Sequence, residues 1–500
     1  MATERYDVIV IGAGFGGSTC AGLLAKRGLK VLLVEKNARA GGKAMSLSKN
    51  GFTYTPWVVI GAPVVGNLYE TVARELGVAD LVQLVTPGSP ASLYRTSSGK
   101  YTRVPDMPVG QSDPNAIFDW LEIKPEDRAA ALMFFAQLTM MPPEEIEKFH
   151  GISFQEWINR HNIPRSLYAF LVSNCCDGMF MVPVDQLEAA EAIASLQDMF
   201  LRHGGIFCRG GFGSVAEAYC EAVRRHGGTV LMKAKTEKIV VADGKVTGVV
   251  TSQGTFNAPI VVSNAGLQPT VLKLVGEQHF GPDYRQYVKR LVPSWALLGY
   301  RYFLRKPVTN VPYGVVFSDD SPWSLERLNQ AHAGQASREG VVYFEVPSNY
   351  DPMAAPPGKQ LMITGSFCPP SPQMTKEQIA TWAKAGEEII FKAFPELESA
   401  IEDKELYTPK DVSNLTRESV LPGHGGETIG LGQIVGQCGP NKPSIEAPVR
   451  GLFFVGCDAG GTGVGTQQAI ESGMNVADAV LRHHRSLITA GATLLEPSRR

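Results

Sequence analysis

A glycine-rich turn near the start of the chain carries the clearest chemical signal. The run Gly12-Ala13-Gly14-Phe15-Gly16-Gly17 follows an apolar stretch and precedes a helical pattern. In this G-x-G-x-x-G spacing, Gly12 permits a tight turn, Gly14 lets the backbone approach a pyrophosphate, and Gly17 lets the helix pack on the strand. The N–H groups that begin the helix favour an anion. The sequence therefore predicts a dinucleotide site.

A carboxylate at the expected distance supports this interpretation. Glu35 ends the next apolar run, 18 positions after Gly17, where an acidic side chain accepts hydrogen bonds from the adenosine ribose hydroxyls. Lys36 follows it directly and is predicted to lie in the same site. These features do not distinguish NAD from FAD, because both cofactors carry the same adenosine diphosphate half.

The segment after Glu35 favours FAD through a resemblance. The glycine pair Gly41-Gly42 is flanked by Arg39 and Lys43, and this pattern resembles the R-x-G-G-R segment of the FAD-dependent amine oxidase and phytoene desaturase superfamily. The resemblance implies that Gly41, Gly42 and Lys43 lie along the flavin diphosphate. Lysine in place of the second arginine keeps the charge but loses a bidentate contact to phosphate.

Further segments extend the resemblance in the same order along the chain. Cys208–Val215 looks like the P-x-G-G-M segment of phytoene desaturases and retinol saturases, and Gly227–Ile239 looks like their G-G-x-I…V-x-x-I stretch, which implies that the backbone around Glu237-Lys238-Ile239 contacts the adenine. Leu452–Asp458 and Gly460–Gln467 are similar to the final FAD motif. There the resemblance implies contacts to the ribityl chain and flavin from Gly456, Asp458, Val464, Gly465, Thr466 and Gln467.

Two positions depart from the family pattern. Phytoene desaturases carry G-F-x-F-D-x-G-P beneath the flavin, whereas Gly51–Trp57 of this chain lacks the aspartate. Cys457 lies inside the turn between Gly456 and Asp458. A thiol there is either a covalent flavin attachment point, as in some amine oxidases, or a small buried side chain, which is the commoner situation.

Candidate acid–base residues are few, because the flavin itself accepts or donates hydride. His424 and Glu427 lie in a glycine-rich loop before the last cofactor strand, and the near-neutral pKa of histidine suits proton exchange with a substrate carbon. The alternative role of His424 is to cap the loop. Clusters of methionine and phenylalanine either line a tunnel for a long apolar ligand or pack in the core: Met133-Phe134-Phe135, Met140-Met141 and Met179-Phe180-Met181.

Strand, glycine-loop and helix patterns position these residues. Tyr6 to Glu35 reads as a βαβ unit with a helix to Arg27, and Asp243-Gly244 signals a hairpin in a second block. A third block ends in a helix to about His484. We predict an α/β fold with a discontinuous Rossmann-like FAD-binding domain and an α+β substrate-binding domain. The expected boundaries are 1–67, 203–266 and 408–486 for the FAD domain, 68–202 and 267–407 for the substrate domain, and 487–500 for a frayed tail.

Composition narrows the class of protein. A net charge of −2 over 500 residues leaves no basic excess for nucleic acid. The eight cysteines form no CxxC pair, which favours reduced thiols in a cytoplasmic protein and predicts no metal site. No apolar run reaches the roughly 18 residues of a membrane span, so any membrane contact is expected to be peripheral.

Together these features predict an FAD-dependent oxidoreductase that desaturates a carbon–carbon bond of an apolar, isoprenoid- or lipid-like substrate. The family resembled is that of phytoene desaturases, retinol saturases and carotenoid isomerases. A saturase or isomerase of the same substrate class, a flavin amine oxidase and a non-catalytic FAD-binding partner subunit stay open as alternatives. The electron acceptor also stays open.

Overall fold

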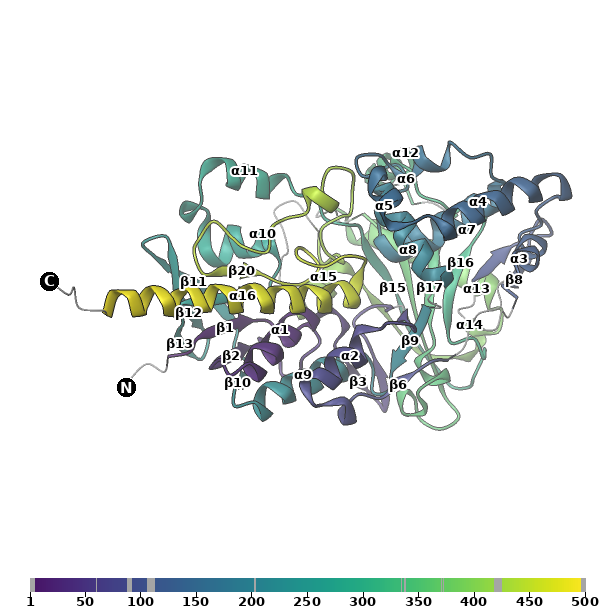
Figure 1. The fold of residues 1–500 in the computed structure, drawn as a ribbon. Helices are drawn as coiled ribbons and strands as arrows, with labels where there is room; N and C mark the ends of the chain where they lie inside the picture. The colour runs from purple at the N-terminus through teal and green to yellow at the C-terminus, as the bar shows by residue number, and fades with distance from the viewer. Residues whose placement is uncertain are drawn as a thin grey trace.

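The computed structural model describes residues 5–59, 61–87, 92–105, 113–201, 204–333, 335–336, 339–369, 371, 373–417 and 425–495. The fold is α/β, built around two large sheets that lie side by side, with the long yellow C-terminal helix along one of them (Figure 1).

A five-stranded parallel sheet forms the first half. Its strand order is β10-β2-β1-β14-β20, and β1, β2, β14 and β20 are continuous apolar runs whose residues are all buried, as parallel strands covered on both faces require. Three segments that are far apart in the sequence contribute strands to this sheet. The strands are β1 (Val8–Ile11), β2 (Val31–Val34), β10 (Thr229–Leu231), β14 (Ile260–Ser263) and β20 (Leu452–Phe454).

Helices α1 and α16 cross this sheet in close contact. A side chain on Gly473 would come within 2.7 Å of the Gly16 carbonyl oxygen, so glycine lets the two helices approach. The covering helices are α1 (Phe15–Lys26), α2 (Leu68–Leu76), α9 (Gly213–Arg225) and α16 (Gly465–Leu495). Helix α16 continues to Leu495. The prediction that a frayed tail begins at residue 487 is therefore wrong about where the tail begins.

A three-stranded antiparallel sheet extends from the first half. It consists of β11 (Thr236–Ala242), β12 (Lys245–Thr251) and β13 (Gly254–Asn257). Asp243 and Gly244 connect β11 to β12, both with positive φ, as the hairpin signal predicted. The segment after β14 folds into α10 (Leu267–Pro269), η6 (Thr270–Gly276), η7 (Glu277–His279) and α11 (Pro282–Arg290).

A seven-stranded sheet forms the second half. Its order is β19-β15-β18-β17-β16-β7-β8, antiparallel except between β16 and β7. The strands are β7 (Leu93–Arg95), β8 (Tyr101–Arg103), β15 (Ala296–Leu304), β16 (Tyr313–Phe317), β17 (Val342–Glu345), β18 (Gln360–Cys368) and β19 (Ile401–Tyr407).

A group of helices gathers at one end of this sheet, at the upper right of Figure 1. They enclose the largest hydrophobic cluster, which contains Phe134, Trp157 and Leu196. The helices are α3 (Pro114–Trp120), α4 (Arg128–Met140), α5 (Pro143–Ile146), η4 (Glu147–Phe149), α6 (Phe154–Ile158), α7 (Arg165–Asn174), η5 (Cys175–Phe180), α8 (Ala189–Leu201) and α12 (Leu325–His332).

Short elements join the two halves. Strand β9 (Gly204–Cys208) pairs with β5 (Ala62–Pro63) and β6 (Leu84–Val85). Helix α13 (Lys376–Ala393) packs against the seven-stranded sheet. The remaining elements are η1 (Gly42–Ala44), β3 (Leu47–Lys49), β4 (Phe52–Tyr54), η2 (Ala79–Leu81), η3 (Pro125–Asp127), η8 (Pro347–Asn349), η9 (Pro352–Ala354), α14 (Leu397–Ala400), α15 (Pro409–Leu415) and η10 (Gly439–Asn441). Among the described residues, no helix is both long and apolar enough to cross a membrane.

Candidate active site

A large cavity begins at the carboxyl end of the parallel sheet and extends between the two halves. Its volume is about 1390 Å³, above the usual range of about 300–1,000 Å³ for a small-molecule pocket. Residues from the glycine turn, the strand end at Glu35, the Gly41-Gly42 loop and the C-terminal motif line it, among them Gly14, Glu35, Gly42, Gly456 and Gln467, whereas no residue of Cys208–Val215 does. Such a volume accommodates a dinucleotide together with a second molecule.

The glycines let three backbone segments meet at this wall. A side chain on Gly42 would come within 3.2 Å of the Gly14 Cα atom, and one on Gly16 within 3.0 Å of the Gly456 Cα atom. Gly17 does not line the cavity. A side chain there would lie 2.0 Å from the Gly12 carbonyl oxygen, so its role is the close packing of helix on strand that the spacing predicts.

Glu35 lines the cavity at the end of β2, where the sequence predicts the adenosine ribose. Its carboxylate accepts hydrogen bonds from the N–H groups of Ala13 and Asn37, each at 2.8 Å. Burial raises the pKa of Glu35. Lys36, which also lines the cavity, donates to the Asn414 carbonyl oxygen at 2.9 Å.

The adenine-side wall differs in detail from the prediction. Residues Ala234, Lys235, Thr236 and Glu237 line the cavity, whereas Ile239 is fully buried in a neighbouring hydrophobic cluster and is not part of the lining. The predicted segment reaches the site, but the contact lies at the start of β11. A strand pattern alone does not show at which residue the strand leaves the cavity.

Asn264 is a residue of the cradle that the motifs did not single out. It follows the buried strand β14 and lies within 4 Å of where side chains on Gly12, Gly14, Gly17 and Gly456 would be. With its amide group turned over, it donates to the Val455 carbonyl oxygen at 3.1 Å and accepts from the Gly17 N–H at 3.3 Å. A polar residue directly after a buried parallel strand is the signal that could have identified it.

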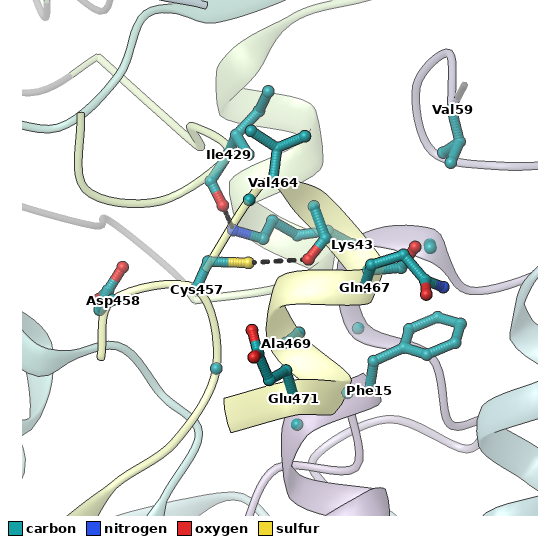
Figure 2. A pocket seen from close by; sticks show the side chains of 18 of the residues that line it. Phe15, Lys43, Val59, Ile429, Cys457, Asp458, Val464, Gln467, Ala469 and Glu471 are labelled. Atoms are coloured by element: carbon teal, nitrogen blue, oxygen red, sulfur yellow. Dashed lines mark hydrogen bonds between the residues drawn. The ribbon is translucent and has the colours of Figure 1, made fainter. Parts of the chain in front are cut away.

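Four charged side chains, two buried and two half-buried, form a network at the cavity wall. Glu427 is paired with Arg417 at 2.5 Å and lies 3.8 Å from the Lys43 ammonium, while Arg417 reaches Asp458 at 3.5 Å. Lys43 also donates to the carbonyl oxygens of Thr428 and Ile429, the latter contact being drawn in Figure 2. The sequence singled out Lys43, Glu427 and Asp458, but Arg417 was missed because no local motif surrounds it.

This network keeps Glu427 ionised. Burial alone would raise its pKa, but the charges of Arg417 and Lys43 and the hydrogen bonds from Arg417 and Thr416 outweigh it and lower the pKa to about 2. Burial lowers the pKa of Lys43. A carboxylate this strongly paired suits positioning of the Lys43 and Asp458 segments better than proton exchange near neutral pH. His424, the other acid–base candidate, lies outside the described residues.

Cys457 lies in the wall between the network and helix α16. Its thiol donates to the Gly465 carbonyl oxygen at 3.3 Å, the second contact drawn in Figure 2. Burial raises the pKa of Cys457. The thiol is therefore held in its protonated form, which is a weaker nucleophile than a thiolate.

The start of α16 supplies further polar groups. The Gln467 Oε1 atom accepts from the Leu68 N–H at 2.8 Å, whereas its Nε2 atom is buried without a hydrogen-bond partner in the protein. The Thr466 hydroxyl forms a hydrogen bond with the Tyr69 hydroxyl at 2.5 Å. Val464 and Gly465 complete this wall. An unpaired buried donor at a helix N-terminus fits the oxygen-rich flavin and phosphate groups of FAD.

Beyond the cradle the cavity becomes apolar. Trp57, Val58, Val59, Met179, Met181, Leu297 and Val315 line this part. Of the methionine and phenylalanine clusters predicted from sequence, only Met179 and Met181 reach it. Phe134 and Phe135 pack in the hydrophobic core, while Met133 and Met140 are 74% and 80% exposed, so helix α4 does not form the wall.

The outer end of the cavity is polar and reaches the surface. Glu147, His150, Glu191 and Asp198 line it, and the Glu147 side chain is 70% exposed. His150 lies 3.2 Å from Glu147 and 3.3 Å from the buried Glu188. Burial raises the pKa of Glu191. Among the described residues, no group of three histidine, cysteine or acidic side chains is placed to hold a metal ion.

Two curated relatives match over most of their length. The all-trans-retinol 13,14-reductase of Homo sapiens is 24% identical and the alignment covers 91% of this chain and 82% of the relative. The lycopene-forming phytoene desaturase of Pseudescherichia vulneris is 23% identical, with coverage of 90% and 94%. The crystal structure of an oxidoreductase from Methanosarcina mazei has the same fold, with a TM-score of 0.69 at 20% identity over 94% of this chain and all of that one.

A family model confirms what the cradle indicates. The model described as flavin containing amine oxidoreductase matches residues 15–481, a span that begins within the glycine turn and includes the Gly41-Gly42 loop and the start of α16. The chain therefore belongs to the flavin containing amine oxidoreductase family and is an FAD-dependent oxidoreductase.

Proposed function

We propose that this enzyme desaturates a carbon–carbon bond of an apolar, isoprenoid- or lipid-like substrate. The observation that carries the proposal is the apolar part of the cavity. There the side chains of Val59, Met181 and Leu297 form an apolar wall that continues from the cofactor cradle. Thioether and aliphatic groups adapt to a long hydrocarbon. The two relatives act on a retinol and on a phytoene according to their names, which supports the same substrate class.

The residues of this chain have limited chemical tasks in such a reaction. Bound FAD supplies the hydride-transfer chemistry. The Trp57–Val59 and Met179–Met181 segments exclude water and orient the substrate, while the network of Lys43, Glu427, Arg417 and Asp458 holds the cradle. Cys457, with its protonated thiol, stays unattached to the cofactor, and Glu427 stays ionised. The proton acceptor of the reaction and the electron acceptor have no assigned residue or partner.

Anaerobic mixing of the oxidised holoenzyme with a polyene precursor such as phytoene in detergent tests the proposal. Desaturation should bleach the flavin absorbance in one turnover and give a product lighter by two hydrogens. A product of unchanged mass would assign an isomerase, and a product heavier by two hydrogens from reduced enzyme would assign a saturase.

The amine oxidase alternative has one specific observation in its favour. Glu147 and Glu191 at the outer end of the cavity could bind an ammonium group. Bleaching by cyclohexylamine or putrescine, with none by the polyene, would replace the proposed function. No bleaching by either substrate class, with FAD bound, would favour a non-catalytic FAD-binding subunit.

A further inference from the structure

Helix α4 exposes an apolar face that no described part of the chain covers. The exposed residues of Arg128–Met140 are Ala129, Leu132, Met133, Ala136, Gln137 and Met140, and no charged residue occurs from Ala129 to Met140. Met133 is 74% and Met140 80% exposed, and Leu201 at the end of the neighbouring helix α8 is 54% exposed. A helix that is apolar on both its inner and outer faces is typical of one that meets a second apolar phase.

This face adjoins the wall of the cavity. The Gln197 side chain, which lines the cavity from α8, donates to the carbonyl oxygens of Leu138 and Met141 at the end of α4, both at 2.8 Å. Pro143, three residues after Met140, lines the cavity as well, and Glu147 lines it where it reaches the surface. The apolar face and the outer opening are thus joined through the end of α4.

We propose that the exposed face of α4 docks on an electrically neutral lipid surface and brings the cavity opening at Pro143 and Glu147 to that surface. The inference rests on the proposed function, because an apolar substrate of the cavity dissolves in lipid. It adds to that function the surface and the route by which the substrate enters.

The charges around α4 distinguish this occupant from others. Residues 119–148 contain seven carboxylates and three cations, a net charge of −4, with Glu126 and Asp127 before the helix and Glu144, Glu145 and Glu147 after it. Anionic lipid would be repelled. A second copy seated face to face would bring like charges together at both rims. At a neutral lipid surface the carboxylates stay in the aqueous headgroup layer while the methionines enter the apolar layer.

Vesicle flotation of the full-length holoenzyme tests the proposal. The parent should float with phosphatidylcholine vesicles to the same extent at low and high salt, and replacing part of the lipid with phosphatidylglycerol should lower the floated fraction. The double substitution Met133→Glu/Met140→Glu should reduce binding by about tenfold or more, because both methionines lose their apolar contact.

A matched control is available in the same chain. Met353 in η9 is 80% exposed, as Met140 is, so Met353→Glu matches the single substitution Met140→Glu in charge and exposed fraction; Met140→Glu should lower flotation, and Met353→Glu should leave it unchanged. Failure of the parent to float, or equal losses in the control, would overturn the proposal. A dimer that only the double substitution dissociates, measured by light scattering, would assign the face to a second copy instead.

Turnover separates this inference from the proposed function. With a polyene presented in detergent micelles, the double variant should keep the parent's flavin content and rate, since its substitutions lie outside the cavity. With the polyene in vesicles its rate should fall in proportion to lost binding. An enzyme that floats but converts no polyene would refute the proposed function while leaving the docking surface intact.

Discussion

The buried carboxyl groups of Glu427 and Glu345 are held in opposite protonation states by their surroundings. Glu427 is kept ionised by two cations, whereas Glu345 is buried and forms no ion pair within the described part of the chain. The Glu345 carboxyl accepts from the Tyr350 hydroxyl and from the Val59 N–H at 3.3 Å. Burial raises its pKa to about 7. The titratable groups that interact with it are Tyr350, Tyr407 and Cys208, and the hydrogen bonds from Tyr350 and Val59 offset only part of the effect of burial.

This position should make stability fall as pH rises. The pKa of Glu345 is higher in the folded than in the unfolded state, so the folded state binds more protons between about pH 4.5 and pH 7, and the contribution of Glu345 is lost across that window. The shift corresponds to roughly 3 kcal/mol of unfolding free energy. Glu345→Gln should therefore gain stability relative to the parent between pH 5 and pH 8 in urea unfolding.

Glu388→Gln, at an exposed position of α13, serves as the control for Glu345→Gln. Its free energy of unfolding should show no such pH-dependent difference from the parent. Glu427 contributes with the opposite sign. Its pKa is lowered to about 2, so its contribution is present above about pH 4.5 and is lost as pH falls towards 2. A Glu345→Gln variant that tracks the parent at every pH would show that Glu345 is already neutral, or already solvated, throughout this range.

At the scale of elements, the cofactor cradle depends on the approach of the Gly41-Gly42 loop to the glycine turn. Gly42 has a φ of 55°, and a side chain there would lie 3.2 Å from the Gly14 Cα atom. Gly42→Ala should displace the loop that carries Lys43 and weaken FAD binding roughly tenfold, or about 1.4 kcal/mol. Titration of the apoprotein with FAD measures this.

Gly77 at the end of α2 provides the comparison. Its φ is 72°, and a side chain there would meet nothing within 4 Å. Gly77→Ala should therefore lower the free energy of unfolding by up to about 1 kcal/mol, because alanine is strained in the left-handed backbone conformation. Its FAD affinity should equal that of the parent. If both variants bind FAD equally well, the close approach of loop and turn does not matter for the cofactor.

These elements also show what a sequence can predict. The glycine turn, the Gly41-Gly42 loop and the start of α16 were predicted because each carries its chemistry in a few consecutive residues. Arg417, Asn264 and the exposure of Met133 were not, because each depends on which distant segment packs against it. The end of α16 at Leu495 was also missed, since a helix that leaves the core has no apolar periodicity to mark its length. The domain boundaries and the roles of individual site residues stay predictions.

At the scale of the whole molecule, the cavity links two halves that have separate hydrophobic clusters. Gly14 and Val34 line it from the parallel-sheet half, and Leu297 and Val315 from the seven-stranded half. A ligand that contacts both halves stabilises both, by about 2.7 kcal/mol when its concentration is a hundred times the dissociation constant. The chain itself provides a reporter for each half.

All six tryptophans belong to one hydrophobic cluster on the side of the seven-stranded sheet: Trp57, Trp120, Trp157, Trp295, Trp323 and Trp382. Their fluorescence therefore follows that half, while release of flavin follows the cradle.

Acid precipitation should release FAD into the supernatant, because the protonated Cys457 forms no link to it. Flavin left on the precipitated chain would instead indicate a thioether at Cys457.

In thermal unfolding of the holoenzyme, flavin release and tryptophan fluorescence should change together. Removing FAD should lower the tryptophan midpoint by a few degrees, although no tryptophan lies in the parallel sheet, because the cofactor stabilises the cradle and the cradle shares one cavity with the wall at Trp57, Leu297 and Val315. Gly42→Ala at sub-saturating FAD should shift the same midpoint in the same direction. A tryptophan midpoint that is identical with and without FAD would show that the two halves unfold independently and that the cofactor stabilises the cradle alone.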